Sequence, residues 1–178
     1  MPEGVWDETN FYGNLRNYYH DLGTGLFRRS LYTIWKRTAA PPNMLLFDVP
    51  GRETCRVRRA RTDTPLQALT LLNDETYLEA ARVLAQRMLR EGGPTTASKL
   101  TFGFKAVLSR SPSAEELKVL SEGLTRRLAK YRMDPAAAKE LISVGLSKID
   151  PTLDPAELAA YTVTASTLLN LDEAVTKE

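Results

Sequence analysis

Cysteine and histidine are almost absent from this chain. Each occurs once in 178 residues, as Cys55 and His20. A single cysteine cannot form a disulfide within the chain, and one cysteine with one histidine cannot supply the ligand sets of most zinc and haem sites. We therefore expect no metal and no cofactor.

Long hydrophobic runs are also absent. No stretch of about 18 apolar residues occurs, so we expect no membrane span. The first ten residues carry acids and lack an apolar core, which is not the pattern of a signal peptide. A hydrophobic content of 43% and a charged content of 26% are ordinary for a globular protein. The length predicts a single domain over residues 1–178.

Positive charge is concentrated in one part of the chain. The net charge is only +2, but residues 26–61 hold nine Arg or Lys against Asp48 and Glu53. That region therefore carries +7, and the rest of the chain carries −5. Such asymmetry indicates either an anionic partner or an acidic surface elsewhere on the same protein.

The front segment, residues 1–63, is irregular. Its first 25 residues lack a clear period, and we expect their aromatic residues to dock on an apolar surface. Apolar residues at helical spacing predict one short helix over residues 26–38, although a strand is an alternative there. Pro41 and Pro42 should end that helix, so residues 43–51 are expected to form an extended loop.

From residue 64 onward the signals are helical. Thr64-Pro65 is a helix start whose buried side is expected to be Leu66, Leu69, Leu71 and Leu72. Further helices are predicted over residues 75–90, 97–108, 113–132, 134–145 and from 154 onward. We predict a mainly α fold: a bundle of about five to six helices, with the irregular Arg/Pro-rich N-terminal segment packed on it.

Several ordered blocks carry a family resemblance. They are residues 28–38 (RRSLYTIWKRT), Pro41-Pro42, Phe47-Asp48, residues 52–55 (RETC), Arg58-Arg59, residues 64–69 (TPLQAL), residues 169–173 (LNLDE) and residues 176–178 (TKE). In this order they resemble the C-terminal domain of large planctomycete proteins, the domain of unknown function numbered fifteen fifty-three. Asp63 and Glu75 depart from the pattern, where we expect Asn and Pro, and Asp63 places an acid among the arginines.

The resemblance implies a setting but not a reaction. Members of this family are usually exported to the periplasm or cell surface and usually carry a haem c-binding domain upstream. The chain is expected to begin partway through that architecture. It has no Cys-x-x-Cys-His motif, so we expect no covalent haem here.

The arginines of the front segment are the strongest site candidate. Guanidinium groups bind carboxylate, sulfate or phosphate in bidentate geometry, so these residues can hold an acidic polysaccharide or a partner's carboxylates. The alternative, which we favour, is a structural network in which they pair with the protein's own acids, such as Asp48, Glu53, Asp63 and Asp74. The candidates are Arg28, Arg29, Arg37, Arg56, Arg58, Arg59 and Arg61.

Other candidates have simpler interpretations. Cys55 is a possible reactive thiol, but without a second cysteine we expect a small buried residue. His20-Asp21 can be an oriented base, and we interpret it as structural. Tyr32, Trp35 and Phe47 can stack on sugars or bases, and their spacing favours the core.

The hypothesis from sequence is an interaction module with no catalytic residues assigned. Its expected partners are the upstream domains of a haem c-containing protein or an acidic polysaccharide. A nucleic-acid-binding domain is the second hypothesis, because basic residues alternate with aromatic ones. Part of an enzyme whose active site needs upstream domains is the third.

Overall fold

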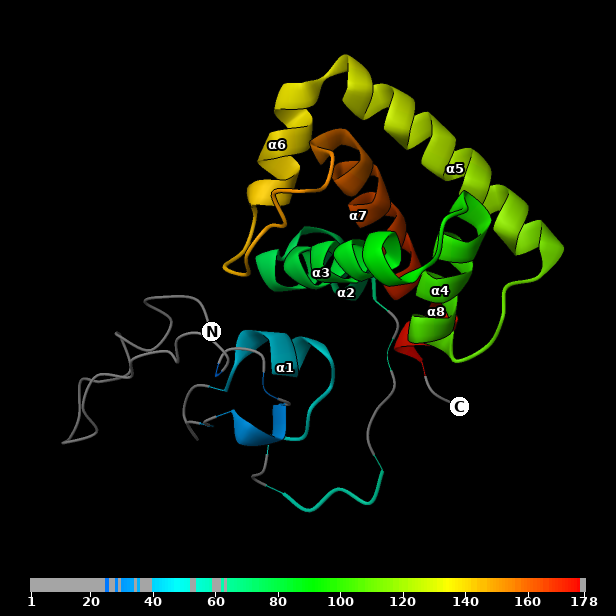
Figure 1. The fold of residues 1–178 in the computed structure, drawn as a ribbon. Coiled ribbons are helices and arrows are strands. Elements are labelled where there is room, and N and C mark those ends of the chain that lie inside the picture. The colour runs from blue at the N-terminus through cyan, green and yellow to red at the C-terminus, as the bar shows by residue number, and fades with distance from the viewer. Residues whose placement is uncertain are drawn as a thin grey trace. The chain divides into compact units, whose positions relative to one another are not determined.

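The computed structural model describes residues 25, 28, 30–33, 35, 40–51, 54–58, 62 and 64–176. The described residues form a mainly helical fold with no strand (Figure 1). The chain divides into two compact units, Met1–Gln67 and Ala68–Glu178, and each is described by itself. The predicted docking of the first 24 residues, His20 included, lies outside the described residues.

The helices follow one another in a simple order. They are the 3-10 turn η3 (Ser30–Tyr32), α1 (Pro42–Leu46), α2 (Pro65–Asn73), α3 (Glu75–Glu91), α4 (Thr96–Leu108), α5 (Ala114–Met133), α6 (Pro135–Ser143), α7 (Pro155–Leu169) and α8 (Asp172–Val175). Six of them have seven residues or more, so the predicted bundle of five to six helices is confirmed.

Two predictions for the first unit are wrong. Within residues 26–38 the described residues form only the turn η3 and bends at Arg28 and Thr33, not an α-helix. Residues 43–46, expected to be extended, belong to the helix α1 instead. Pro42 occupies the first turn of α1, where its missing N–H is not needed, and the amides of Met44 and Leu45 both donate to Pro41 O.

The predicted start of α2 is confirmed, but its predicted buried side is wrong. The Thr64 hydroxyl accepts a hydrogen bond from the backbone amide of Gln67 at 3.3 Å. The Gln67 side-chain oxygen accepts one from the backbone amide of Thr64 at 2.9 Å. Leu66, Leu69 and Leu72 are more than half exposed, and the buried residue of α2 is Gln67. Polar contacts rather than hydrophobicity decide which side of this helix is covered.

In the second unit each long helix begins with a side-chain cap. The caps of α3 to α7 are Asp74, Thr95, Ser113, Asp134 and Asp154. Each cap oxygen accepts a backbone N–H that has no partner within its helix, which fixes where that helix starts. The starts predicted at residues 74, 113, 134 and 154 are confirmed.

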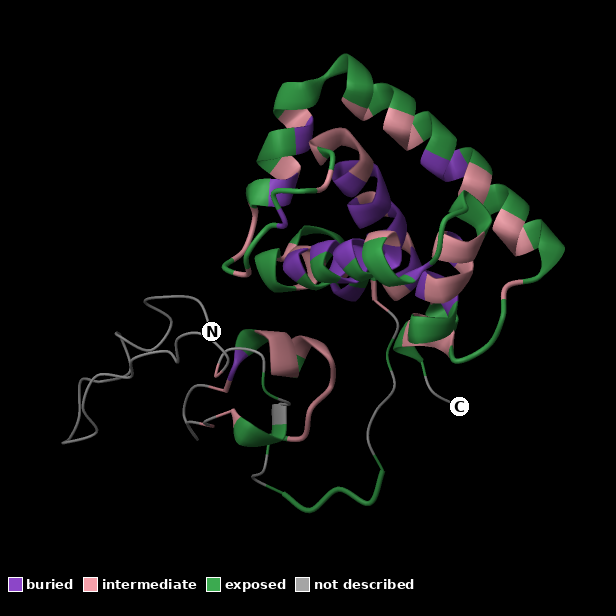
Figure 2. Cartoon of the chain, in the orientation of Figure 1, coloured by how far each residue is buried: buried purple, intermediate pink, exposed green. Residues whose placement is uncertain are grey.

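Helix α7 runs through the middle of the second unit, where it contacts α3, α4, α5, α6 and α8 (Figure 1). Buried residues gather on α3 and α7 (Figure 2). Leu158, Tyr161 and Leu168 are buried, as predicted. Thr162 and Thr164 are also buried, which was not predicted. The two threonine hydroxyls donate to the carbonyls of Leu158 and Ala160, so they add no unsatisfied polar group to the core.

Helices α3 and α4 approach closely at Gly103. A Cβ atom at this position would lie 2.6 Å from Met88 Sδ, and Met88 is fully buried. An alanine at this position would therefore require the buried Met88 side chain to move.

Candidate functional site

The arginine-rich segment of the first unit is closed at its base by hydrogen bonds. Asp48 Oδ2 accepts from the backbone amide of Thr62 at 3.1 Å and from its hydroxyl at 2.5 Å. Gln67 Nε2 donates to Leu46 O at 2.8 Å and to Thr62 Oγ1 at 3.0 Å. Asp48 has a φ of 55°, which turns the chain sharply after α1. The segment between Asp48 and Thr62 is therefore a loop with a fixed base, which we call the arginine loop.

The described arginines of the loop face solvent. Arg56 and Arg58 are exposed, and neither forms an ion pair with another described residue. Arg28 is also exposed, and its guanidinium lies 6.0 Å from the centre of the Tyr32 ring. The other predicted members, Arg29, Arg37, Arg59 and Arg61, lie outside the described residues.

The predicted pairing of these arginines with internal acids stays a prediction. Of the four acids proposed for it, Asp48 bonds to Thr62, and Asp74 caps α3 through Thr76. Glu53 and Asp63 lie outside the part of the chain that the structure describes. The contacts of the two described acids show that each has a structural role of its own.

Two interpretations of single residues are wrong. Cys55 is exposed, not buried, and its described neighbours in residues 54–58 are exposed as well. Tyr32 is 66% exposed and is not a core residue. Trp35 and Phe47 are half-buried.

A polar stripe on α3, not predicted from the sequence, holds the segment between α6 and α7. Glu79 Oε1 accepts hydrogen bonds from the backbone amides of Leu146, at 3.1 Å, and Ser147. Arg82 Nη2 donates to the carbonyl and hydroxyl of Ser147 at 3.0 and 2.7 Å, and lies 3.7 Å from Glu79 Oε1. The Arg82 side chain is 1% exposed, and its Nε and Nη1 have no hydrogen-bond partner among the described residues.

The same stripe continues along α3. Gln86 Oε1 accepts from the backbone amide of Asp150 at 2.9 Å, and Arg90 donates to Asp150 Oδ2. Residues 79, 82, 86 and 90 follow helical spacing, so all four point to one side of α3. This stripe anchors residues 146–150.

The carboxylates of this stripe are held in their charged forms. Burial by itself raises the pKa of Glu79, but the hydrogen bonds from Ser147 and Leu146 and the charge of Arg82 outweigh it, so the pKa is lowered. Hydrogen bonds from the backbone and side chain of Thr152, together with Arg90, lower the pKa of Asp150. The stripe is therefore a structural element at neutral pH rather than a proton donor.

A second charged cluster is centred on Arg110, between α4 and α5. Its guanidinium bonds both oxygens of Glu116 and both oxygens of Glu173, and lies 4.8 Å from the centre of the Phe104 ring. These bonds raise the pKa of Arg110 further above its usual range and lower that of Glu116 to about 2. The cluster ties the start of α5 to α8.

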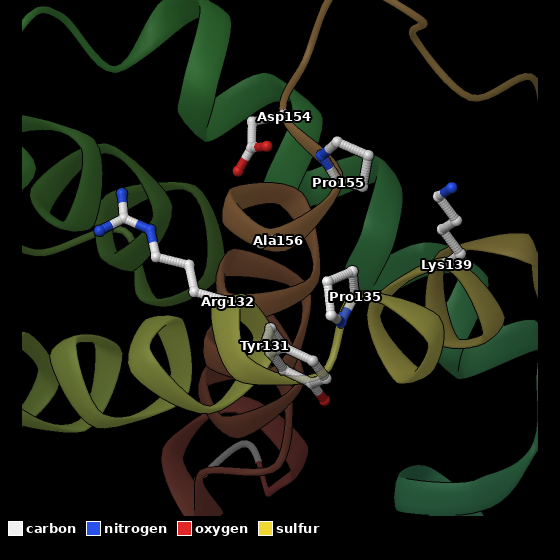
Figure 3. Close-up of a pocket in the computed structure, with 7 residues that line it drawn as sticks. All are labelled: Tyr131, Arg132, Pro135, Lys139, Asp154, Pro155 and Ala156. Atoms are coloured by element: carbon white, nitrogen blue, oxygen red, sulfur yellow. The ribbon is translucent and has the colours of Figure 1, made fainter.

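The second unit also contains an open pocket of about 330 Å³ where α5, α6 and the start of α7 meet (Figure 3). Its lining residues are Tyr131, Arg132, Pro135, Lys139, Asp154, Pro155 and Ala156. In Figure 3, Arg132 and Lys139 extend on either side of the two proline rings. Both charged side chains are exposed.

The described residues contain no group of three or more His, Cys, Asp or Glu side chains placed to hold a metal ion. No helix among them is long and apolar enough to cross a membrane.

Sequence reasoning missed the polar stripe because it followed the apolar positions of α3. The available signal was Gln86 and Arg82, polar residues at helical spacing beside Ala81 and Ala85, which are fully buried. Nothing in the sequence alone shows what those polar residues contact, because Ser147 and Asp150 lie more than 60 positions away.

Comparison with known proteins gives a single match. The family described as PSD1, protein of unknown function (DUF1553), matches residues 5–124. No curated protein and no solved structure matches the chain. The matched region covers more than half of the chain and crosses both units, from the front segment into α5. The chain therefore belongs to the PSD1 family of proteins of unknown function.

Proposed function

We propose that this chain is a non-catalytic interaction module that binds an anionic partner through its arginine loop. The observation that carries the proposal is the exposure of Arg56 and Arg58 on a loop whose base is pinned by Asp48, Thr62 and Gln67. Between Asp48 and Thr62 the sequence holds five arginines and one acid, Glu53. An anion bound there faces concentrated positive charge, and the acids Asp48 and Asp63 stand at the two flanks of the segment.

The fixed base of the loop supports binding in a second way. Ordering a flexible loop when a partner binds costs conformational entropy, and every described bond at the base reduces that cost. Guanidinium groups on such a loop can form bidentate bonds to carboxylates or sulfates spaced along a polymer.

We further propose a setting for this module. The partner is an acidic polysaccharide or the acidic surface of upstream haem c-containing domains, in an exported, cytochrome-associated system. The resemblance described above motivates this setting. Cell fractionation with an antibody against the chain tests the location, and recovery in the cytoplasm would contradict it.

The single cysteine provides a direct test of loop binding. Cys55 is exposed and adjacent to Arg56, so an environment-sensitive thiol dye on Cys55 reports on a ligand at the loop. We expect polygalacturonate to change the dye signal saturably, with an affinity that falls as salt rises. Arg56→Ala/Arg58→Ala should weaken binding about tenfold, because it removes two charge-assisted contacts.

The matched control is Lys118→Ala/Lys130→Ala, which removes the same charge from exposed positions of α5. This variant should bind as the unchanged protein does. Equal affinity of the two double variants would refute the loop as the binding site. A DNA oligonucleotide that competes on equal terms at equal charge concentration would favour the nucleic-acid hypothesis over a polysaccharide.

A further inference from the structure

We propose that the pocket between α5, α6 and α7 binds a sugar acid, a hydroxylated ring that carries one carboxylate. The pocket lies wholly in the second unit, and its residues are separate from the arginine loop. The inference is therefore independent of the proposed function. A volume of about 330 Å³ is within the range of small-molecule sites.

The walls of the pocket suit the face of a small ring. Tyr131, Pro135, Pro155 and Ala156 supply ring and methyl surfaces (Figure 3). Tyr131 is half-buried and packs against the hydrophobic core, so its ring is held in place. Burial raises the pKa of its hydroxyl, which therefore stays protonated and can act as a donor at neutral pH. C–H faces of a sugar pack well on such surfaces.

The charges on either side of these walls select for a carboxylate. Arg132 and Lys139 are exposed, and neither forms an ion pair with another residue in the described part of the chain. Their cationic groups can each donate to a ligand anion. The pocket therefore offers a cation on either side of the proline rings for the carboxylate of a ligand.

Asp154 adds a requirement for hydroxyl groups. Its Oδ2 accepts the backbone amide of Glu157 at 2.9 Å as the cap of α7, which fixes the orientation of the carboxylate. The carboxylate can accept a hydrogen bond from a ligand hydroxyl, and it repels any negatively charged group of a ligand placed next to it. A ring with hydroxyls at one edge and a carboxylate at another satisfies both conditions.

The pocket is formed before any ligand arrives. Asp134 donates its amide to Lys130 O at the end of α5, while its side chain caps α6 through Ala137. Pro135 and Pro155 each occupy the first turn of their helix, where the ring restricts φ. Little backbone freedom around the pocket therefore remains to be lost on binding.

Titration of the ¹⁵N-labelled chain with galacturonate tests the proposal. We expect saturable shifts of the backbone amides of Arg132, Lys139 and Ala156. Galactose, which lacks the carboxylate, and acetate, which lacks the ring, should each bind at least about tenfold more weakly. Absent or unsaturable shifts, or equal binding of acetate, would overturn the proposal.

Two kinds of variant separate the pocket from general charge effects. Arg132→Gln/Lys139→Gln should weaken galacturonate binding about tenfold, whereas Lys118→Gln/Arg126→Gln, at other exposed positions of α5, should not. Ala156→Leu fills the pocket without changing charge and should also abolish the shifts, with circular dichroism confirming the fold. Retained binding in Ala156→Leu would overturn the site.

The arginine-loop variant distinguishes this proposal from the proposed function. Arg56→Ala/Arg58→Ala should keep its galacturonate shifts, because neither residue lines the pocket. Loss of the shifts in that variant would place the sugar acid on the loop and overturn the pocket. Loss of polygalacturonate binding alone leaves the pocket supported.

Discussion

Glu79 and Arg82 are two residues whose structural role could not be recognised in the sequence. Both are buried and charged, and both are used to hold the backbone of Leu146 and Ser147. A buried charge is costly unless polar partners replace water, and the segment between α6 and α7 supplies such partners to Glu79 Oε1 and Arg82 Nη2.

Glu79→Ala should lower the free energy of unfolding by about 3 kcal/mol, because it leaves two backbone amides without their acceptor and removes the carboxylate 3.7 Å from the buried Arg82 guanidinium. Glu79→Gln keeps an acceptor oxygen and should cost less. Urea denaturation followed by circular dichroism measures both. Glu122→Ala, at an exposed position of α5, is the control and should change little.

Glu116 should make stability depend on pH in the acid range. Its bonds to Arg110 and Ser113 lower its pKa from 4.5 to about 2, so the folded state binds a proton less readily than the unfolded state. The stabilisation is therefore present above pH 4.5 and is lost as the pH falls towards 2. Melting temperatures of the unchanged protein and Glu116→Gln should converge over that interval; a constant difference would contradict the assignment.

At the scale of the element, the segment between α6 and α7 depends on Gly145. Its φ is +89°, and a Cβ atom there would lie 2.6 Å from Glu79 Cδ. The turn at Gly145 therefore brings the amides of Leu146 and Ser147 to Glu79 without a collision.

Gly145→Ala should lower the free energy of unfolding by about 2 kcal/mol, from backbone strain and the displacement of Glu79. Hydrogen exchange should show loss of protection at the Leu146 and Ser147 amides before any loss in α7. Gly51→Ala is the control, because nothing lies within 4 Å of the added methyl group. Unchanged protection at residues 146 and 147 would show that Gly145 is not what positions them.

At the scale of the whole molecule, the hydrophobic core cluster formed by the described residues lies in the second unit. The core cluster runs from Ala81 to Ala165, and α3 and α7 contribute most of its members. A unit that holds its own core can fold without the rest of the chain.

A fragment of residues 64–178, which keeps the Thr64 cap of α2, should therefore be helical and unfold cooperatively. Thermal denaturation followed by circular dichroism, with hydrogen exchange of α7 amides, checks this. A broad, non-cooperative transition would mean that the first unit is required for the core to form. The pocket lined by Tyr131 and Lys139 should survive in the fragment.

The helix starts could be predicted from sequence because their causes are local. Asp74, Ser113, Asp134 and Asp154 each cap a helix through an amide two or three residues further on. The interior of α7 could be predicted as well, since its apolar residues recur at helical spacing. The helix predicted over residues 26–38 was wrong, because aromatic and β-branched residues favour no single local structure there.

The candidate sites also have features that the sequence shows and features that only the fold produces. The arginine loop is recognisable from its composition. The hydrogen bonds at its base are not, because Asp48 contacts Thr62, 14 positions away, and Gln67 contacts Leu46, 21 positions away. The pocket brings together residues of α5, α6 and α7, and no motif connects Tyr131 to Asp154 in the sequence. Exposure of Cys55 and of the α2 leucines likewise follows from what packs nearby.

The sequence by itself determined the fold class, the starts of most long helices of the second unit and the family of this protein. Helix caps and helical periodicity act over a few residues, and the order of motifs can be read directly from the sequence. Only the tertiary structure decided which polar residues are buried, how the polar stripe of α3 holds the segment after α6, and where a pocket opens. Those features depend on contacts between distant residues, and a side chain's role as core, clamp or ligand contact is set by the partner that the fold brings to it.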